Sequence, residues 1–410
     1  MTDPSWISAA LVAARPRAVG ALLRYFRDLD LAEEAYQDAC LKALTAWPEK
    51  GPPRDPAAWL IFVGRNVGVD GVRRRAKSQA LPDEEALSDL DDVEAPMADR
   101  LDNADYRDDV LRLLFVCCHP DLPPTGQIAL ALRIVSGLSV AQIARAFLVG
   151  EKAMEQRITR AKARVGAAGV AFETPGAVER SERLGVVAAM IYLVFNEGYT
   201  APDPASDRAG LCDEAIRLGR LLLRLFPAEP EILGLVALML LQHARAGARF
   251  DADGQVVLLD AQDRSKWDGR QISEGLALID KAMRHRRPGP YQVQAAIAAL
   301  HARAATPEAT DWSGIARLYE TLEAMQPSPV VTLNRAVAVM KGEGPEAALD
   351  MIEPLAQPLD GYFYFHGLKG ALLKQLGRPR EARAAFDQAV SLANTPAEAA
   401  HIRAEIEGLG

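Results

Sequence analysis

The sequence predicts an all-α protein built from several domains. Its 410 residues are too many for one compact core, so two or three domains are expected. Apolar residues make up 49% of the chain and charged residues 25%, which is the balance of an ordinary globular protein. Apolar positions recur at helical spacing, and no long run of alternating β-branched residues interrupts them.

The N-terminal residues predict an amphipathic helix rather than a secretion signal, because no basic segment precedes an apolar stretch. No uninterrupted apolar run is long enough to cross a bilayer, so no membrane partner is expected. The cysteines have no framework spacing and are expected to be reduced thiols; they are Cys40, Cys117, Cys118 and Cys212. A cytoplasmic protein is therefore expected.

Helical periodicity and helix-capping residues divide the N-terminal part of the chain. A helix pair is predicted over residues 5–28 and a further helix over 31–47, ended by Pro48. The next helix begins at the N-cap Asp55 and continues to an arginine cluster. After a low-hydrophobicity linker, helices resume at Tyr106. The predicted domains are 1–80, an acidic linker over 81–104, 105–172 and a helical domain over 177–410.

The net charge of −8 conceals two basic patches on either side of the acidic linker. The first holds Arg65, Arg73, Arg74, Arg75 and Lys77, and the second holds Lys152, Arg157, Arg160, Lys162 and Arg164. Solvated helix faces explain one such patch. Two patches separated by an acidic tether favour two DNA-contacting modules.

Helices and a repeat are predicted in the C-terminal domain. Two segments align at an offset of 35 residues, against the 34-residue period of tetratricopeptide repeats. The matched pairs are Ala336 with Ala371, Gly342 with Gly377, Glu346 with Glu381 and Ala347 with Ala382. Such helix pairs stack into a solenoid with a concave face. Further helices are predicted over 211–226, 231–246, 273–285, 291–304 and 312–325.

Residues 137–165 predict a helix-turn-helix. Ser139 caps a short helix, and a tight turn at 148–150 leads to a second helix whose buried face carries Met154, Ile158 and Val165. Its other face carries side chains suited to base edges and phosphates, namely Lys152, Gln156, Arg157, Arg160 and Arg164. Helical hairpins of this type also occur outside DNA binding.

Two segments, one before and one after the acidic linker, resemble two regions of a known family in the order in which that family has them. Residues 31–77 resemble sigma region two and residues 137–165 resemble the region-four helix-turn-helix of extracytoplasmic-function RNA polymerase sigma factors. The resemblance covers about residues 11–165. The whole chain resembles the subgroup with a tetratricopeptide-like C-terminal extension, as do LFVCCHPDL, YLVFNEGYTA and the QDRSKWD stretch.

The resemblance implies a sigma factor that binds core RNA polymerase and starts transcription at specific promoters. It implies contacts to the β′ clamp helices and the β flap, with Glu34, Gln37 and Asp38 on the clamp-binding face of one helix. A solvated polar face is the alternative. It implies recognition of the −10 element by Asn66, Asp70, Arg73, Arg74, Arg75 and Lys77. Asp70 departs from the pattern, because an acid suits DNA poorly.

Other polar clusters carry weaker hypotheses. Cys117 and Cys118 with His119 suggest a metal, but adjacent cysteines share a tetrahedral site awkwardly, and helix packing is favoured. Residues 196–199 and the segment 262–264 with Trp267 suggest pockets, or equally helix caps and a polar cluster between helices. No catalytic constellation or phosphate-binding loop stands out, so neither enzyme activity nor a cofactor is expected.

Two other function classes fit parts of the pattern. One is a helix-turn-helix regulator that acts without polymerase, which has no need of the Glu34, Gln37 and Asp38 face. The other is a scaffold whose repeats bind peptides. For the sigma interpretation, the C-terminal domain is expected to regulate activity in cis or to recruit a protein partner on its concave face.

Overall fold

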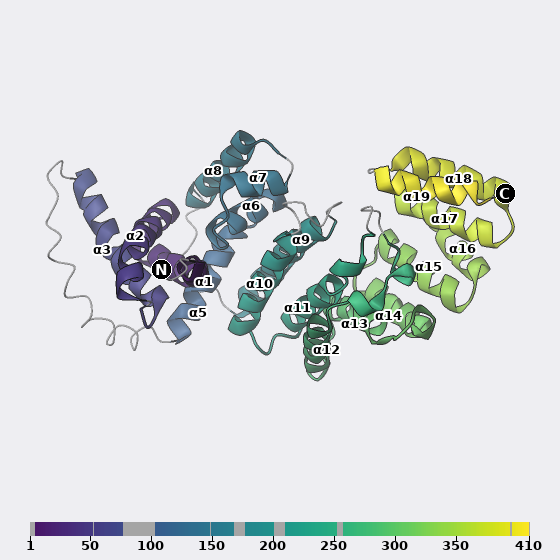
Figure 1. Ribbon diagram of the computed structural model, residues 1–410, viewed down its shortest axis with the longest axis horizontal. Coiled ribbons are helices and arrows are strands. Elements are labelled where there is room, and N and C mark those ends of the chain that lie inside the picture. The colour runs from purple at the N-terminus through teal and green to yellow at the C-terminus, as the bar shows by residue number, and fades with distance from the viewer. Residues whose placement is uncertain are drawn as a thin grey trace. The chain divides into compact units, whose positions relative to one another are not determined.

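The computed structural model describes residues 5–51, 53–76, 103–147, 149–167, 177–200, 210–251, 257–393 and 396–409. These residues form α-helices and short 3-10 turns, and they contain no strand of a sheet (Figure 1). The expected all-α class is confirmed. The chain divides into two compact units, Met1–Leu221 and Leu222–Gly410, which are described separately below.

Unit 1 begins with three packed helices, α1 (Ser5–Phe26), α2 (Leu29–Lys50) and α3 (Pro56–Ala76). The third begins as predicted, because the Asp55 carboxylate accepts hydrogen bonds from the amides of Ala57 and Ala58. The core between the helices includes Leu22, Trp47 and Leu60, each at most 2% exposed.

The first two predicted helix boundaries are wrong, and proline is the reason. The expected helix pair over 5–28 is one helix with Pro16 inside it. Pro16 has no backbone N–H, so it cannot donate the hydrogen bond that a helical residue makes to the carbonyl four residues earlier. In the preceding turn, the Leu11 carbonyl accepts a hydrogen bond from Tyr36 Oη at 2.8 Å. Likewise α2 passes Pro48 and ends at Lys50, where the capping residue Gly51 has a φ of 83° that suits glycine.

Four further helices follow, α5 (Asn103–Cys117), α6 (Pro124–Ile134), α7 (Val140–Ala146) and α8 (Glu151–Ala167). Most of the expected acidic linker, residues 81–102, lies outside the described residues, and α5 already begins at Asn103. Unit 1 continues with α9 (Ala177–Tyr199), which packs on α5 and α6, and with most of α10 (Gly210–Leu225). The compact division therefore falls later in the chain than the expected boundary at residue 177. The expected polar break at 196–199 belongs to α9.

One described stretch, Trp6–Phe26, is long and apolar enough to cross a membrane by length and composition alone. Three arginines, Arg15, Arg17 and Arg24, interrupt its apolar residues. Of its most apolar window, 56% is buried against the rest of the protein, as in the core helix of a bundle.

Unit 2 is a series of helices in which neighbours along the chain pack on one another (Figure 1). The three-residue 3-10 turns lie at the helix connections. The α-helices are α11 (Pro230–His243), α12 (Gly269–Met283), α13 (Pro290–Arg303), α14 (Trp312–Met325), α15 (Pro329–Gly342), α16 (Pro345–Ile352), α17 (Phe363–Gln375), α18 (Pro379–Leu392) and α19 (Pro396–Glu407). The helices predicted over 211–325 are confirmed, with ends close to the predicted ones.

The repeat is confirmed, but its register is 34 residues rather than 35. At an offset of 34, buried positions of α15 and α16 meet buried positions of α17 and α18. The pairs are Ala336 with Gly370, Val339 with Leu373, Ala348 with Ala382 and Ile352 with Phe386. The offset of 35 instead matches the fully buried Ala336 with the half-buried Ala371. The buried positions therefore repeat every 34 residues, which is the period of tetratricopeptide repeats.

Candidate nucleic-acid and polymerase interfaces

The helix-turn-helix forms where it was predicted, from α7 to α8. Ser139 accepts a hydrogen bond from the Gln142 amide, and the Gln142 side chain accepts one from the Ser139 amide, so the two form a capping box. On α8, Met154, Ile158 and Val165 are buried at 0%, 5% and 6% exposure. The opposite face is therefore available for contacts with another molecule.

Four of the five predicted DNA-contacting residues on α8 surround one hollow. Lys152, Gln156, Arg160 and Arg164 are exposed and Arg157 is half-buried. A hollow of about 410 Å³ lies between this face and the start of α6. Its lining includes Gln156, Arg157, Arg160 and Arg164 from α8, with Thr125 and Gly126 from α6 and the α6 N-cap residue Pro123. Guanidinium groups opposite a helix N-terminus make a site of positive potential.

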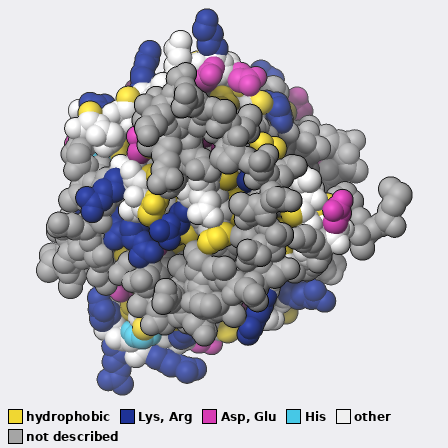
Figure 2. Space-filling view, turned by 90° about the vertical axis from the view of Figure 1, so that its left-hand side faces the viewer, with side chains coloured by type: hydrophobic (Ala, Val, Ile, Leu, Met, Phe, Trp, Pro, Cys, Tyr) yellow, Lys and Arg dark blue, Asp and Glu magenta, His cyan; other side chains and the backbone are white. Residues whose placement is uncertain are grey.

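The −10 candidates lie toward the C-terminal end of α3. Asn66 is exposed. Asp70, Arg73, Arg74 and Arg75 belong to α3, but their side chains are not described, and Lys77 lies outside the described residues. Figure 2 views the side of unit 1 that carries α3, where Lys and Arg side chains gather beside exposed apolar atoms.

An exposed aromatic lies beside Arg65, the residue that precedes Asn66 in α3, and sequence reasoning missed it. The Arg65 guanidinium lies 4.2 Å from the centroid of the Tyr25 ring, and Tyr25 is 47% exposed. Phe26 meets Tyr25 edge-on and packs against Gly68, where an added Cβ would touch the Phe26 ring. These contacts hold the end of α1 on α3. Tyr25 and Arg65 are forty residues apart in the sequence, and only the folded chain brings them together.

The predicted polymerase-binding face of α2 extends further than the sequence suggested. Glu34 and Gln37 are exposed and Asp38 is half-buried. Leu41 and Leu44 are exposed at 64% and 52%, among the most exposed large apolar side chains of the described residues. Leu41 lies two turns after Glu34, so helical spacing alone was enough to find it.

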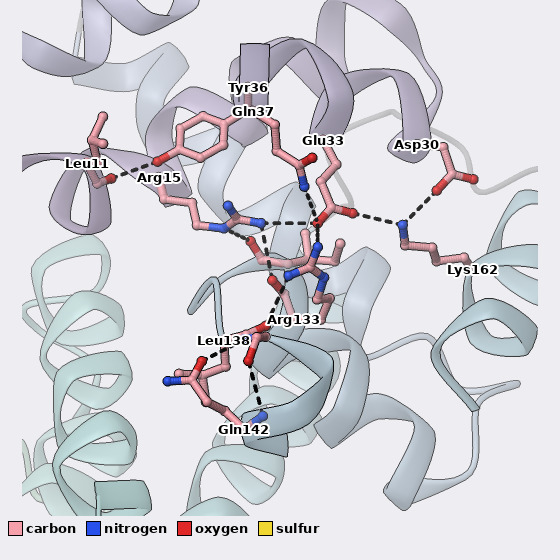
Figure 3. Close-up of polar contacts among 12 residues, drawn as sticks. Leu11, Arg15, Asp30, Glu33, Tyr36, Gln37, Arg133, Leu138, Gln142 and Lys162 are labelled. Carbon is pink, nitrogen blue, oxygen red and sulfur yellow. Dashed lines mark hydrogen bonds and ion pairs between the residues drawn. The ribbon is translucent and has the colours of Figure 1, made fainter. Parts of the chain in front are cut away.

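Next to that face, a buried carboxylate joins four helices (Figure 3). Glu33 of α2 has a side chain only 6% exposed, and Gln37 Nε2 donates to it at 3.5 Å. Three cations surround Glu33: Arg15 of α1 at 3.4 Å, Arg133 of α6 at 3.0 Å and Lys162 of α8 at 2.8 Å. Lys162 also binds Asp30 at 2.7 Å. We call these five charged residues the Glu33 cluster.

The electrostatics of Lys162 favour its charged form. Burial alone lowers the pKa of Lys162, but hydrogen bonds and charge attraction from Asp30 and Glu33 raise it overall. Lys162 therefore stays protonated, and its ammonium faces α2 rather than the exposed face of α8.

The cysteines are buried or half-buried free thiols. Burial raises the pKa of Cys118 to about 12 and that of Cys117 well above its ordinary value, so both are neutral. Among the described residues, no cluster of three or more potential metal ligands occurs. The two thiols lie in the helix core near the end of α5.

In unit 2, the segment 262–264 with Trp267 forms an internal polar cluster. Arg264 donates to the carbonyls of His301 and Ala304 at 2.7 and 2.5 Å and lies over the Trp267 ring. Burial, followed by the charges of Arg245 and Arg264, lowers the pKa of His301 to about 4. The neutral imidazole packs edge-on against Trp312. These contacts fit the polar-cluster alternative.

Comparisons with known proteins agree with this architecture. Residues 11–78 match the family described as Sigma-70 region 2, and residues 112–165 match Sigma-70, region 4. Residues 183–283 match a family of unknown function, DUF6596. The uncharacterized protein R00370 of Rhizobium meliloti (strain 1021) is 71% identical over 410 residues, covering 100% of this chain and 97% of its own.

Among solved structures, the crystal structure of yeast Tom70 matches with a TM-score of 0.39 and 12% identity. The match covers 97% of this chain and 83% of the Tom70 chain. It is too weak to carry an argument, and the repeat assignment rests on the helix pairs of unit 2 themselves. With sigma-70 regions 2 and 4 present in order, the chain belongs to the sigma-70 family and carries a C-terminal helical-repeat extension.

Proposed function

We propose that this sigma factor reads the −35 element with α8 and the −10 element with the end of α3 while α2 holds core RNA polymerase. Its family role is promoter-specific transcription initiation. The observation that carries the residue-level proposal is the two-sided α8, which buries an apolar face and exposes a face rich in arginine and glutamine.

On α8, position along the helix separates the two kinds of DNA contact. Lys152 and Gln156 lie in the first turns, which enter the major groove, and are assigned to base edges. Arg160 and Arg164 lie further along and are assigned to phosphates, with Arg157 between the two groups. A phosphate in the hollow beside α6 would meet both arginines and the α6 N-terminus.

At the −10 element, Asn66 and the stacked pair of Tyr25 and Arg65 are assigned to an unpaired base. An exposed aromatic ring accepts any base by stacking, and an arginine beside it adds positive charge. The remaining assignments come from the family resemblance: Asp70 stays near the base, and Arg73, Arg74, Arg75 and Lys77 bind phosphates.

Polymerase docking is assigned to the α2 face made by Glu34, Gln37, Asp38, Leu41 and Leu44. Acidic groups followed along the helix by exposed apolar side chains suit a basic partner helix that also has apolar residues, as we propose for the β′ clamp helices. The β flap is assigned to the second module, 105–172, on the resemblance alone. The proposed place of action is the cytoplasm, where core polymerase and chromosome are.

Unit 2 is proposed to modulate initiation in cis, or to recruit a protein on its repeats. Removing it at Leu221, the end of unit 1, leaves both sigma modules and most of their packing intact. A changed level of transcription from the shortened chain supports modulation. An unchanged level rejects it.

The docking proposal is tested by core-polymerase affinity with a charge-matched control. The variant Glu34→Ala with Asp38→Ala removes two acids one turn apart from α2. The control Glu346→Ala with Asp350→Ala does the same on α16 of unit 2, where both acids are exposed. We expect at least a tenfold loss for the α2 pair only. Equal affinities for both variants would reject docking through α2.

A helix-turn-helix regulator that acts without polymerase remains the second candidate function. The same experiment separates the two candidates, because such a regulator does not bind core polymerase through α2.

A further inference from the structure

Unit 2 displays a short basic stretch of chain that the assignments above leave without a role. Residues 281–287 begin in the last turn of α12 and continue past its end at Met283. They contain four permanently charged cations and no acid. All four side chains are exposed, namely Lys281, Arg284, Arg286 and Arg287. We call residues 281–287 the basic segment.

The cations of the basic segment have no acidic partner among the described residues. No ion pair or side-chain hydrogen bond joins any of them to another side chain in the described part of the chain. The acid just before the segment on α12, Asp280, lies one turn before Arg284 but binds Arg303 of α13 at 3.1 Å. Like charges held close together repel, so this arrangement is unfavourable in the protein alone. A negatively charged partner would remove that repulsion.

The backbone of the basic segment is strained at one of its arginines. Arg286 has a φ of 52°, in the left-handed region that glycine enters freely and other residues avoid. Its amide donates to the Met283 carbonyl at 3.2 Å, just after the end of α12. A glycine at position 286 would form the same turn without strain. The turn itself therefore gives no reason for an arginine at this position.

Hydrogen bonds beneath the basic segment fix its position. The Glu231 carboxylate, in the first turn of α11, accepts hydrogen bonds from the amides of Tyr291 and Gln292 at 3.1 and 3.2 Å. Gln292 is 1% exposed, and its Nε2 donates to the Arg287 carbonyl at 2.8 Å. Gly289 lies so close to Glu231 that an added Cβ would overlap the carboxyl group. Because the segment is held between α11, α12 and α13 (Figure 1), it loses little conformational freedom on binding.

The chemistry of the basic segment favours a phosphate backbone over a protein partner. Guanidinium groups match phosphate oxygens in both geometry and charge. Protein interfaces instead bury an apolar centre, and within residues 281–287 the one large apolar side chain that is exposed is Met283, at 55%. Residues 284–287 span at most about 14 Å, or about four base pairs at 3.4 Å each. Their arginines can therefore contact neighbouring phosphates of one duplex.

We propose that the basic segment is a third DNA-contacting surface, which binds the phosphate backbone of duplex DNA outside the −10 and −35 elements. The proposal goes beyond the function proposed above, which gives unit 2 no contact with DNA. The choice of DNA as the partner rests on the sigma-70 family role, which brings the chain to promoters, and not on the assignments of α2, α3 or α8. The contact is independent of sequence, because phosphates do not carry the pattern of the base edges.

The test is an anisotropy titration of the full-length protein with a duplex that lacks promoter elements, at several salt concentrations. The variant is Arg284→Ala with Arg287→Ala. The matched control is Arg380→Ala with Arg383→Ala on α18, which removes two exposed arginines at the same spacing. For the basic-segment variant alone, we expect the affinity to fall about tenfold and the slope of log affinity against log salt to fall by about 2.

Equal affinities of these two variants would overturn the proposal and leave the basic segment to an acidic protein or an anionic membrane. Wild-type protein that does not bind the duplex at low salt would overturn it as well. The titration contains neither polymerase nor a promoter element, so it is unaffected if docking or promoter recognition fails. Loss of specific transcription in turn rejects the function proposed above and not the DNA contact of unit 2.

A single substitution separates DNA binding from folding. Arg286→Gly removes one cation and also relieves the strained backbone. It should therefore lower the affinity for the duplex about threefold, while the thermal stability of unit 2 stays the same or rises. Lower stability with unchanged affinity would overturn the proposal, because the arginine would then act within the fold and not on DNA.

Discussion

Replacing Glu33 by glutamine is expected to destabilise unit 1 by about 3 kcal/mol, because it removes the charge on which three cations converge. The side chains of Arg15, Arg133 and Lys162 are 9%, 24% and 19% exposed, so water replaces the lost carboxylate poorly. Breaking a buried pair by removing one partner costs about 3–5 kcal/mol, and glutamine, which still accepts one hydrogen bond, belongs at the lower end.

The assay is unfolding in urea, monitored by hydrogen exchange of individual peptides, so that unit 1 is observed separately from unit 2. The matched control is Asp30→Asn, one turn earlier on α2. Its side chain is 73% exposed and shares Lys162 with Glu33, so its loss should cost less than about 1 kcal/mol. Equal losses for Glu33→Gln and Asp30→Asn would refute the burial argument, as would protection of α8 that stays unchanged in Glu33→Gln.

Four further outcomes are expected. Arg160→Ala should weaken binding to −35 duplexes of any sequence and reduce the slope of log affinity against log salt by about 1, measured by anisotropy titration. Tyr25→Ala should weaken binding of single-stranded −10 DNA to the polymerase complex by about 1–3 kcal/mol, while Tyr25→Phe keeps it. His301 has a folded pKa of about 4, which lies below its unfolded value. Its contribution to stability is therefore present above about pH 6.5 and is lost as pH falls toward 4. The free energy of unfolding of unit 2 should fall by about 2 kcal/mol between pH 7 and 5, and His301→Asn should remove this pH dependence. Gly370→Ala should destabilise unit 2 by about 1–3 kcal/mol in thermal unfolding, because its Cβ would lie 2.5 Å from the Phe386 ring, and intact stability would contradict the close packing of α17 on α18.

Local patterns predicted the fold class and the helix-turn-helix because the responsible interactions lie within a few residues. Ser139 caps α7 through Gln142, and the buried face of α8 follows the helical period. The division of residues 5–28 into two helices and the helix end at Pro48 were misjudged, because tertiary packing carries each helix past an internal proline that usually ends one. The repeat was found by similarity of small residues, but only burial distinguished a register of 34 from one of 35.

The candidate site was predictable only in part. The exposed face of α8 and the acidic face of α2 follow from periodicity within one helix. The pairing of Glu33 with Lys162 joins residues 129 positions apart, and that of Tyr25 with Arg65 joins two different helices. Neither is visible in a single sequence, because nothing local distinguishes Glu33 from its exposed neighbour Glu34.

The most direct test of the central claim is transcription in vitro with purified core polymerase, the full-length protein and a pool of genomic promoter fragments. Discrete transcripts that require the protein, and that are lost when Glu34, Gln37 and Asp38 are all replaced by alanine, are the expected result. If neither the full-length protein nor the chain ending at Leu221 yields specific transcripts, initiation by α3 and α8 together with core polymerase is contradicted.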